Sequence, residues 1–103
     1  MNALSELQKW YFAQCDGDWE HSYGVKIDTL DNPGWTIEID LVGTNLSERT
    51  FEERSYGTGS DAEASGNEWL FCKVANDKFI ASGGPDKLEE MINVFLIWAR
   101  SAA

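Results

Sequence analysis

The chain has 103 residues, and its hydrophobic share of 43% is that of a folded domain rather than of a disordered chain. A chain of this length holds one core and rarely two, so we expect a single domain over residues 1–103. The 18 acidic against 8 basic residues give a net charge of -10, which argues against nucleic acid as a partner and favours a cationic protein.

Two cysteines, Cys15 and Cys72, are too few for the disulfide framework of a small secreted domain, so we expect both to be reduced. Cys72 lies in an apolar stretch and Cys15 among acids, and neither environment favours a reactive thiolate. The first fifteen residues carry polar and charged side chains at helical intervals, which is typical neither of a signal peptide nor of a membrane span. A cytoplasmic location without membrane contact is the expectation.

Apolar residues recur at three- and four-residue steps from Asn2 to Gln14, which predicts an amphipathic helix. Asn2 is suited to cap its start, and Asp16-Gly17 to end it, because glycine tolerates the left-handed conformation at helix ends. The expected apolar face consists of Leu4, Leu7, Trp10 and Tyr11.

Two stretches that alternate apolar with polar residues, 23–28 and 35–41, predict a pair of strands. Between them lies DNPG, residues 31–34. Pro33 and Gly34 predict a type II turn, since proline presets the first central angle and glycine accepts the positive φ of the second. An antiparallel hairpin follows from this pattern.

The segment ERTFEERSYG, residues 48–57, is mostly polar, with Phe51 as its large apolar residue, and predicts a weaker strand at the edge of a sheet. The small polar residues from Gly57 to Glu68 show no periodicity and predict a mobile surface loop. A second hairpin follows, with strands over 69–75 and 78–82 joined by Asn76 and Asp77, residue types that accept turn angles.

The last segment predicts a helix that is apolar on nearly all sides in its second half, and therefore one packed against the sheet. Pro85 is suited to its first position. The whole pattern predicts an α+β fold with an N-terminal helix, about five antiparallel strands in a meander-like sheet and a C-terminal helix, both helices on one sheet face. The other face should be acid-rich and carry Lys26, Asp28, Thr36, Glu38 and Asp40.

The segment CDGDWEHSYG, residues 15–24, combines three acids with the chain's one histidine. Its acids alternate like the first ligands of an EF-hand loop, but His21 and Ile27 occupy the positions that need glycine and a bidentate glutamate. No GxSxG context accompanies His21 either. We therefore predict no metal, cofactor or catalytic site, with a small enzyme or ligand-binding domain built around His21 as the alternative.

The five tryptophans cannot all lie at the surface. Trp10, Trp69 and Trp98 fall in regular apolar patterns and are expected between the helices and the sheet. Trp19 either anchors an interface with a basic partner or folds back to cap the core. Trp35 begins a strand and is compatible with either face.

Several stretches resemble the immunity protein 53 family of bacterial polymorphic toxin systems: LQKWYFAQCDGDWEHSYGVKIDTLDNPGW, IDLVGT, WLFCKV, ASGGP and LEEMINVFLIWA. The resemblance covers nearly the whole chain and is weakest over residues 45–68. It implies a cytoplasmic protein that binds and neutralises a cognate toxin domain and catalyses no reaction. Many such toxins are nucleases and therefore cationic.

The family's toxin contacts do not transfer residue by residue, so the predicted partner-binding surface comes from the residues themselves. It joins the acidic loop, the DNPG turn and the acids of the open sheet face. Its members are Asp16, Asp18, Trp19, Glu20, His21, Tyr23, Asp28, Asp31, Trp35, Glu38 and Asp40. Binding either plugs the toxin's active site or covers a site beside it, and the protein itself is a monomer or a homodimer, with an acidic homodimeric adaptor as a further alternative.

Overall fold

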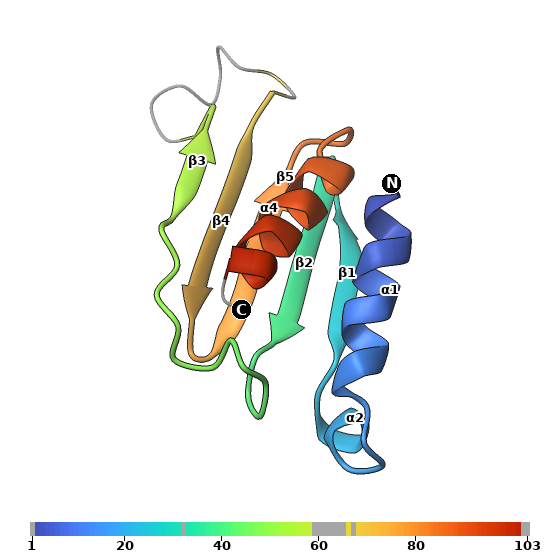
Figure 1. Ribbon diagram of the computed structural model, residues 1–103. Helices are drawn as coiled ribbons and strands as arrows, with labels where there is room; N and C mark the ends of the chain where they lie inside the picture. Colours follow the sequence, from blue (N-terminus) through green and yellow to red (C-terminus); the bar gives the residue numbers. More distant parts are fainter. Residues whose placement is uncertain (1, 32, 59–65, 67, 102–103) are drawn as a thin grey trace.

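The computed structural model describes residues 2–31, 33–58, 66 and 68–101. It contains helices α1 (Ala3–Gln14), α2 (Trp19–Ser22) and α4 (Leu88–Ser101) and strands β1 (Val25–Leu30), β2 (Gly34–Asp40), β3 (Arg54–Tyr56), β4 (Leu70–Ala75) and β5 (Lys78–Gly83). The strands form one antiparallel sheet in the order β1-β2-β5-β4-β3 (Figure 1). The predicted α+β class and helix-sheet-helix order are confirmed.

The strand order differs from the predicted meander, because β2 pairs with β5 and not with β3. After β2 the chain crosses to the far edge of the sheet before β3 begins (Figure 1). Leu46, which is fully buried, and Phe51 attach this crossing segment to the core. β3 is then the edge strand that its polar sequence predicted.

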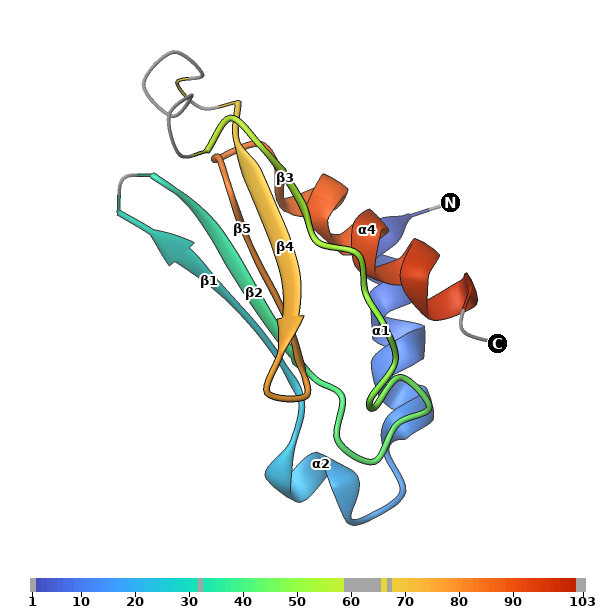
Figure 2. The same ribbon diagram turned by 90° about the vertical axis from the view of Figure 1, so that its left-hand side faces the viewer.

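Both long helices cover the same face of the sheet (Figure 2), as predicted. Alternate residues of the central strands point toward them, because successive side chains of a strand face opposite ways. The fully buried residues of this face include Ile37, Ile39, Cys72, Phe79 and Ala81, with Met91 and Phe95 of α4 packed against them.

The start and the end of α1 are as predicted. The Asn2 side-chain oxygen accepts hydrogen bonds from the backbone N–H groups of Leu4 (2.9 Å) and Ser5 (3.2 Å), and Gly17 beyond the helix has a φ of +90°. The predicted apolar face is only partly buried. Leu7 lies in the core, whereas Leu4 is 53% exposed and Tyr11 37% exposed.

The two hairpin turns differ in how well the sequence predicted them. Asn76 and Asp77 have φ angles of 54° and 58°, the pair of left-handed residues that a type I′ turn requires. The predicted type II turn at Gly34 is wrong, because Gly34 pairs with Leu30 within the sheet and is not among the residues of positive φ. Glycine is needed there for another reason: a Cβ at Gly34 would collide with the backbone oxygen of Gly83.

The last helix starts three residues later than predicted. Pro85 lies in a turn, closed by a hydrogen bond from the N–H of Lys87 to the Gly84 carbonyl (3.0 Å), and α4 begins at Leu88. The strand β5 runs on to Gly83, so this turn is required to bring the chain from the sheet end onto its face. The predicted mobile loop, Gly57 to Glu68, falls largely on residues 59–65 and 67, outside the described residues.

Cys15 and Cys72 are both free thiols. Burial raises the pKa of Cys72 to about 12, which agrees with the unreactive environment that its strand predicted. In the described ranges, the helices are all too short or too polar to cross a membrane.

Candidate protein-binding surface

The acidic loop between α1 and β1 is an ordered connection held by its own carboxylates. Asp16 accepts hydrogen bonds from the backbone N–H groups of Asp18 (3.0 Å) and Trp19 (2.9 Å). Glu20 accepts from the backbone N–H groups of Asp16 (3.0 Å) and Gly17 (2.9 Å). These bonds position α2, so Asp16 and Glu20 serve the local fold whether or not they also meet a partner.

The same bonds lower the pKa of both carboxyl groups. Asp16 is stabilised in its charged form by the N–H groups of Trp19 and Asp18, and the pKa of Glu20 is lowered by its own backbone N–H and by those of Asp16 and Gly17. A carboxylate that accepts backbone hydrogen bonds loses them when it is protonated. Acid should therefore loosen this loop.

We expect Asp16→Asn to lower the free energy of unfolding at pH 7 and to have less effect in acid. The folded pKa of Asp16 lies below the ordinary value of 3.8, so its charged form stabilises the fold above that pH and the contribution is lost as pH falls through the lower folded pKa. Urea unfolding at neutral pH and near pH 3 measures this difference. Asp18→Asn is the matched control, because Asp18 makes no side-chain capping bond; equal effects of the two substitutions at both pH values would contradict the assignment.

Trp19 caps the core beneath this loop, the second of its two predicted alternatives. It is only 8% exposed, and its indole N–H donates to the Val42 carbonyl at 2.7 Å. Its ring lies 6.4 Å from that of Trp10 and 6.1 Å from those of Tyr11 and Tyr23. In this structure Trp19 supports the loop from inside and does not present its ring to a partner.

His21 and Tyr23 are exposed. Both lie at the end of the molecule formed by α2 (Figure 1). Asp40 lies at the same end, and its side chain accepts a hydrogen bond from the backbone N–H of Gly24 (3.0 Å). Within the described residues, His21 is absent from the lining of the cavities at α1, at the end of α4 and beside β3. The enzymatic alternative, which needs a pocket at His21, stays a prediction.

The open sheet face is charge-balanced, and the prediction that it is acid-rich is wrong. Lys78 lies 2.9 Å from Glu38 and 3.9 Å from Asp40, and the Lys78 pair lowers the pKa of Glu38. The register also places Lys26 opposite Glu38. Lys73 points to the same face, since it pairs with Ile80 directly beside Glu38. Three lysines thus accompany the three predicted acids Asp28, Glu38 and Asp40.

The acidic loop and the DNPG turn do not converge into one patch. They lie at opposite ends of β1 (Figure 1), whose six residues span about 20 Å at roughly 3.3 Å each. Asp31 is exposed at the far end. Trp35 is half-buried against the helix side of the core and donates its indole N–H to the Pro85 carbonyl (3.0 Å).

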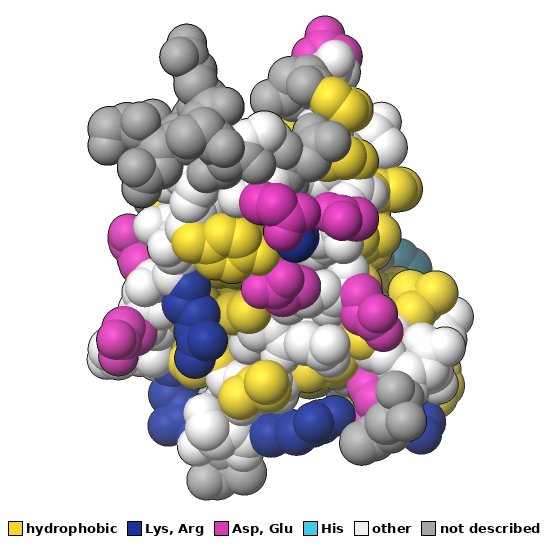
Figure 3. Space-filling view, turned by 90° about the horizontal axis from the view of Figure 1, so that it is seen from above, with side chains coloured by type: hydrophobic (Ala, Val, Ile, Leu, Met, Phe, Trp, Pro, Cys, Tyr) yellow, Lys and Arg dark blue, Asp and Glu magenta, His cyan; other side chains and the backbone are white. Residues whose placement is uncertain are grey.

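The structure also gathers a cluster that sequence reasoning missed, at the start of α4. Lys87 lies 2.8 Å from Glu68 and 3.8 Å from Asp86, and the Tyr56 hydroxyl donates to Glu90 at 2.9 Å. Figure 3 looks onto this end and shows acidic side chains around a basic one. The sequence alone did not predict this cluster, because Glu68 and Tyr56, which contact Lys87 and Glu90, come from other parts of the chain.

Next to this cluster, a cavity of about 580 Å³ lies between β3 and α4. Its lining includes Glu52, Glu53, Tyr56 and Glu90, with Arg54 as the basic residue. Partial burial, and then the Glu90 hydrogen bond, raise the pKa of Tyr56. Negative charge therefore also collects away from the predicted surface.

Together, these features define an acidic α+β domain with exposed charged and aromatic surfaces. Among the described residues, no group of three or more His, Cys, Asp and Glu side chains is placed to hold a metal ion. The chain belongs to the immunity protein 53 family, whose family model matches residues 4–100. Comparisons with curated proteins and with solved structures gave no match. The matched range covers nearly all of the described fold and confirms the resemblance found in the sequence.

Proposed function

We propose that this chain is a cytoplasmic immunity protein that binds and neutralises a cognate toxin domain of a bacterial polymorphic toxin system. The observation that carries the proposal is the family match over residues 4–100. On this account the protein acts by occupying the toxin and needs neither a cofactor nor a reaction of its own.

The charge of the chain supports a basic, nuclease-type toxin as the partner. A net charge of -10 raises the rate at which a cationic protein is captured, and opposite charges that meet at the interface favour the correct orientation. The proposed contacts lie on the α2 side and along β1. They comprise Asp18, His21, Tyr23, Asp28 and Asp31, with Asp16 and Glu20 holding the loop in place.

The experiment is an inhibition titration with the toxin domain encoded by the neighbouring gene. Toxin activity should fall in proportion to the added protein and vanish at a ratio of one to one. Cells that express the toxin should survive only when this chain is also expressed. A toxin that stays fully active at excess protein would refute the proposal.

Matched charge reversals test where the toxin binds. One variant replaces Asp18, Asp28 and Asp31 by lysine. The control variant replaces Glu52, Glu53 and Glu89 by lysine and changes the net charge by the same amount. All six residues are exposed. Weaker binding by the first variant alone supports the proposed surface. Equal weakening by both variants would mean that only the overall charge matters.

A further inference from the structure

The edge strand β1 offers unpaired backbone groups to a partner. It is the first strand in the sheet order, with a neighbour on one side only. The Asp40 N–H donates to the Gly24 carbonyl (3.0 Å), and because bonded and non-bonded pairs alternate between antiparallel strands, Lys26 and Asp28 also bond to β2. The backbone groups of Val25, Ile27 and Thr29 therefore point away from β2.

One of these outward groups is already occupied, since the Thr29 N–H donates to the Asp28 side chain at 2.8 Å. The N–H groups of Val25 and Ile27 remain as outward donors on the geometry of the ladder. The opposite edge, β3, has three residues against six in β1. β1 is thus the longer template for an added strand.

A groove lies along this edge on its helix side. Its walls are Leu4, Leu7, Gln8 and Tyr11 of α1 and Gly24, Val25 and Ile27 beside them, and it has a volume of about 300 Å³. We call it the α1–β1 groove. Leu4, Tyr11 and Ile27 are 53%, 37% and 37% exposed, so its apolar surface is open to solvent.

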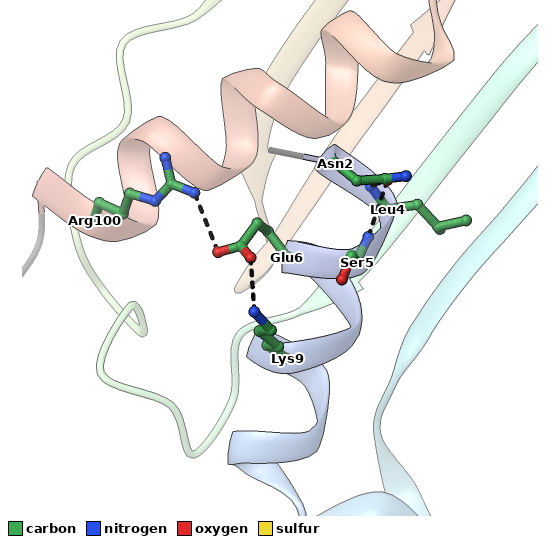
Figure 4. A network of polar contacts seen from close by, with 6 residues as sticks. All are labelled: Asn2, Leu4, Ser5, Glu6, Lys9 and Arg100. Carbon is green, nitrogen blue, oxygen red and sulfur yellow. Dashed lines mark hydrogen bonds and ion pairs between the residues drawn. The ribbon is translucent and has the colours of Figure 1, made fainter.

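The helix α1 is held so that its apolar side faces this groove. Glu6 lies 3.5 Å from Arg100 of α4 and 3.1 Å from Lys9 on one side of α1. Leu4 points away from α4, toward the side on which β1 lies (Figure 4). α1 therefore packs on α4 with one side and leaves the other unfilled above the edge of the sheet.

We propose that the α1–β1 groove receives an extended segment of the toxin domain, which adds to β1 as a sixth strand. This inference rests on the proposed function. Backbone hydrogen bonds to Val25 and Ile27 would hold the segment, and its alternate apolar side chains would enter the groove. In strand addition, the backbone bonds generally give affinity and the side-chain pockets give specificity.

The charges around the groove specify a basic segment. Asp18 and Glu20 lie in the loop before β1, and Asp31 follows its other end, so the groove has acids at both ends and an apolar floor. A second copy of this chain would bring a further charge of -10 to the same edge. Charge therefore favours a cationic toxin segment over self-association.

The test uses the toxin domain of the neighbouring gene, carrying a substitution that abolishes its activity, and amide hydrogen exchange of the unmodified protein. We expect the Val25 and Ile27 amides to become protected in the complex. Ile27→Pro removes an N–H that β2 does not use, which an edge strand tolerates, and should weaken binding about tenfold or more. Ile27→Val keeps the N–H and should bind nearly as the wild type does.

A second pair of variants tests the groove itself. Ile27→Asp should weaken binding about tenfold or more, whereas Ile97→Asp, the same change at a residue of α4 that is 60% exposed, should leave it unchanged. Circular dichroism establishes that each variant is folded.

The outcomes separate the two proposals. If the wild type does not bind the toxin, the proposed function fails. If it binds while the Val25 and Ile27 amides stay unprotected and the Ile27 variants bind as the wild type does, the function stands and the groove assignment is overturned. If these amides are protected without toxin and the protein has twice its monomer mass, a second copy occupies the groove and the assignment to the toxin is overturned.

Discussion

Replacing Phe95 by alanine is expected to lower the free energy of unfolding by about 3 to 5 kcal/mol, the usual cost of removing a buried phenylalanine ring. Phe95 is fully buried at the point where α4 meets both α1 and the sheet. Its ring lies 4.9 Å from that of Trp10, 5.2 Å from that of Phe79 and 6.3 Å from that of Trp98. The substitution thus leaves a cavity with aromatic walls on three sides.

Urea unfolding followed by tryptophan fluorescence measures this loss. Ile97→Ala is the control, because Ile97 lies on the same helix but is largely exposed, and its effect should stay within about 0.5 kcal/mol. Similar losses for the two variants would contradict the packing of α4 described above.

Trp19→Ala should cost about 3 to 5 kcal/mol of folding free energy as well. The ring fills the space among Trp10, Tyr11 and Tyr23. The backbone packs closely against this ring at Gly43, which has a φ of +77° and where a Cβ would lie 3.3 Å from the indole. Loss of the ring removes the support of the whole acidic loop.

The conservative variant Trp19→Phe separates packing from hydrogen bonding. It keeps an aromatic ring but leaves the Val42 carbonyl without its indole donor, which should cost about 1 to 3 kcal/mol. Thermal and urea unfolding, together with the affinity for the toxin, distinguish the two predicted roles of Trp19. If Trp19 were a surface anchor, the substitution would lower the affinity for the toxin and leave the stability unchanged. The burial of Trp19 predicts the reverse, a lower stability at unchanged affinity.

The local elements were predictable because their signals are local. Asn2 as a cap, the period of two in β2 and the Asn76-Asp77 turn each depend on a few neighbouring residues, and the structure confirms all three. The pairing of β2 with β5 brings Asp40 beside Lys78. No periodicity in the sequence selects β5 as the partner of β2. The predicted meander order was therefore wrong, although the strands themselves were predicted correctly.

The candidate site was predicted less completely, because its electrostatics depend on tertiary contacts. The acids of the 15–24 loop were found, but not that Lys78 neutralises Glu38 from another strand. Trp19 could not be placed, since its hydrogen-bond acceptor lies 23 residues away at Val42. The α1–β1 groove likewise depends on the side of α1 that α4 leaves uncovered.

The most direct test of the central claim is a calorimetric titration of this protein with the toxin domain of the neighbouring gene, at low and at raised salt. The account predicts tight binding at a ratio of one to one that weakens as salt screens the opposite charges. The absence of heat and of co-purification at both salt concentrations would contradict it.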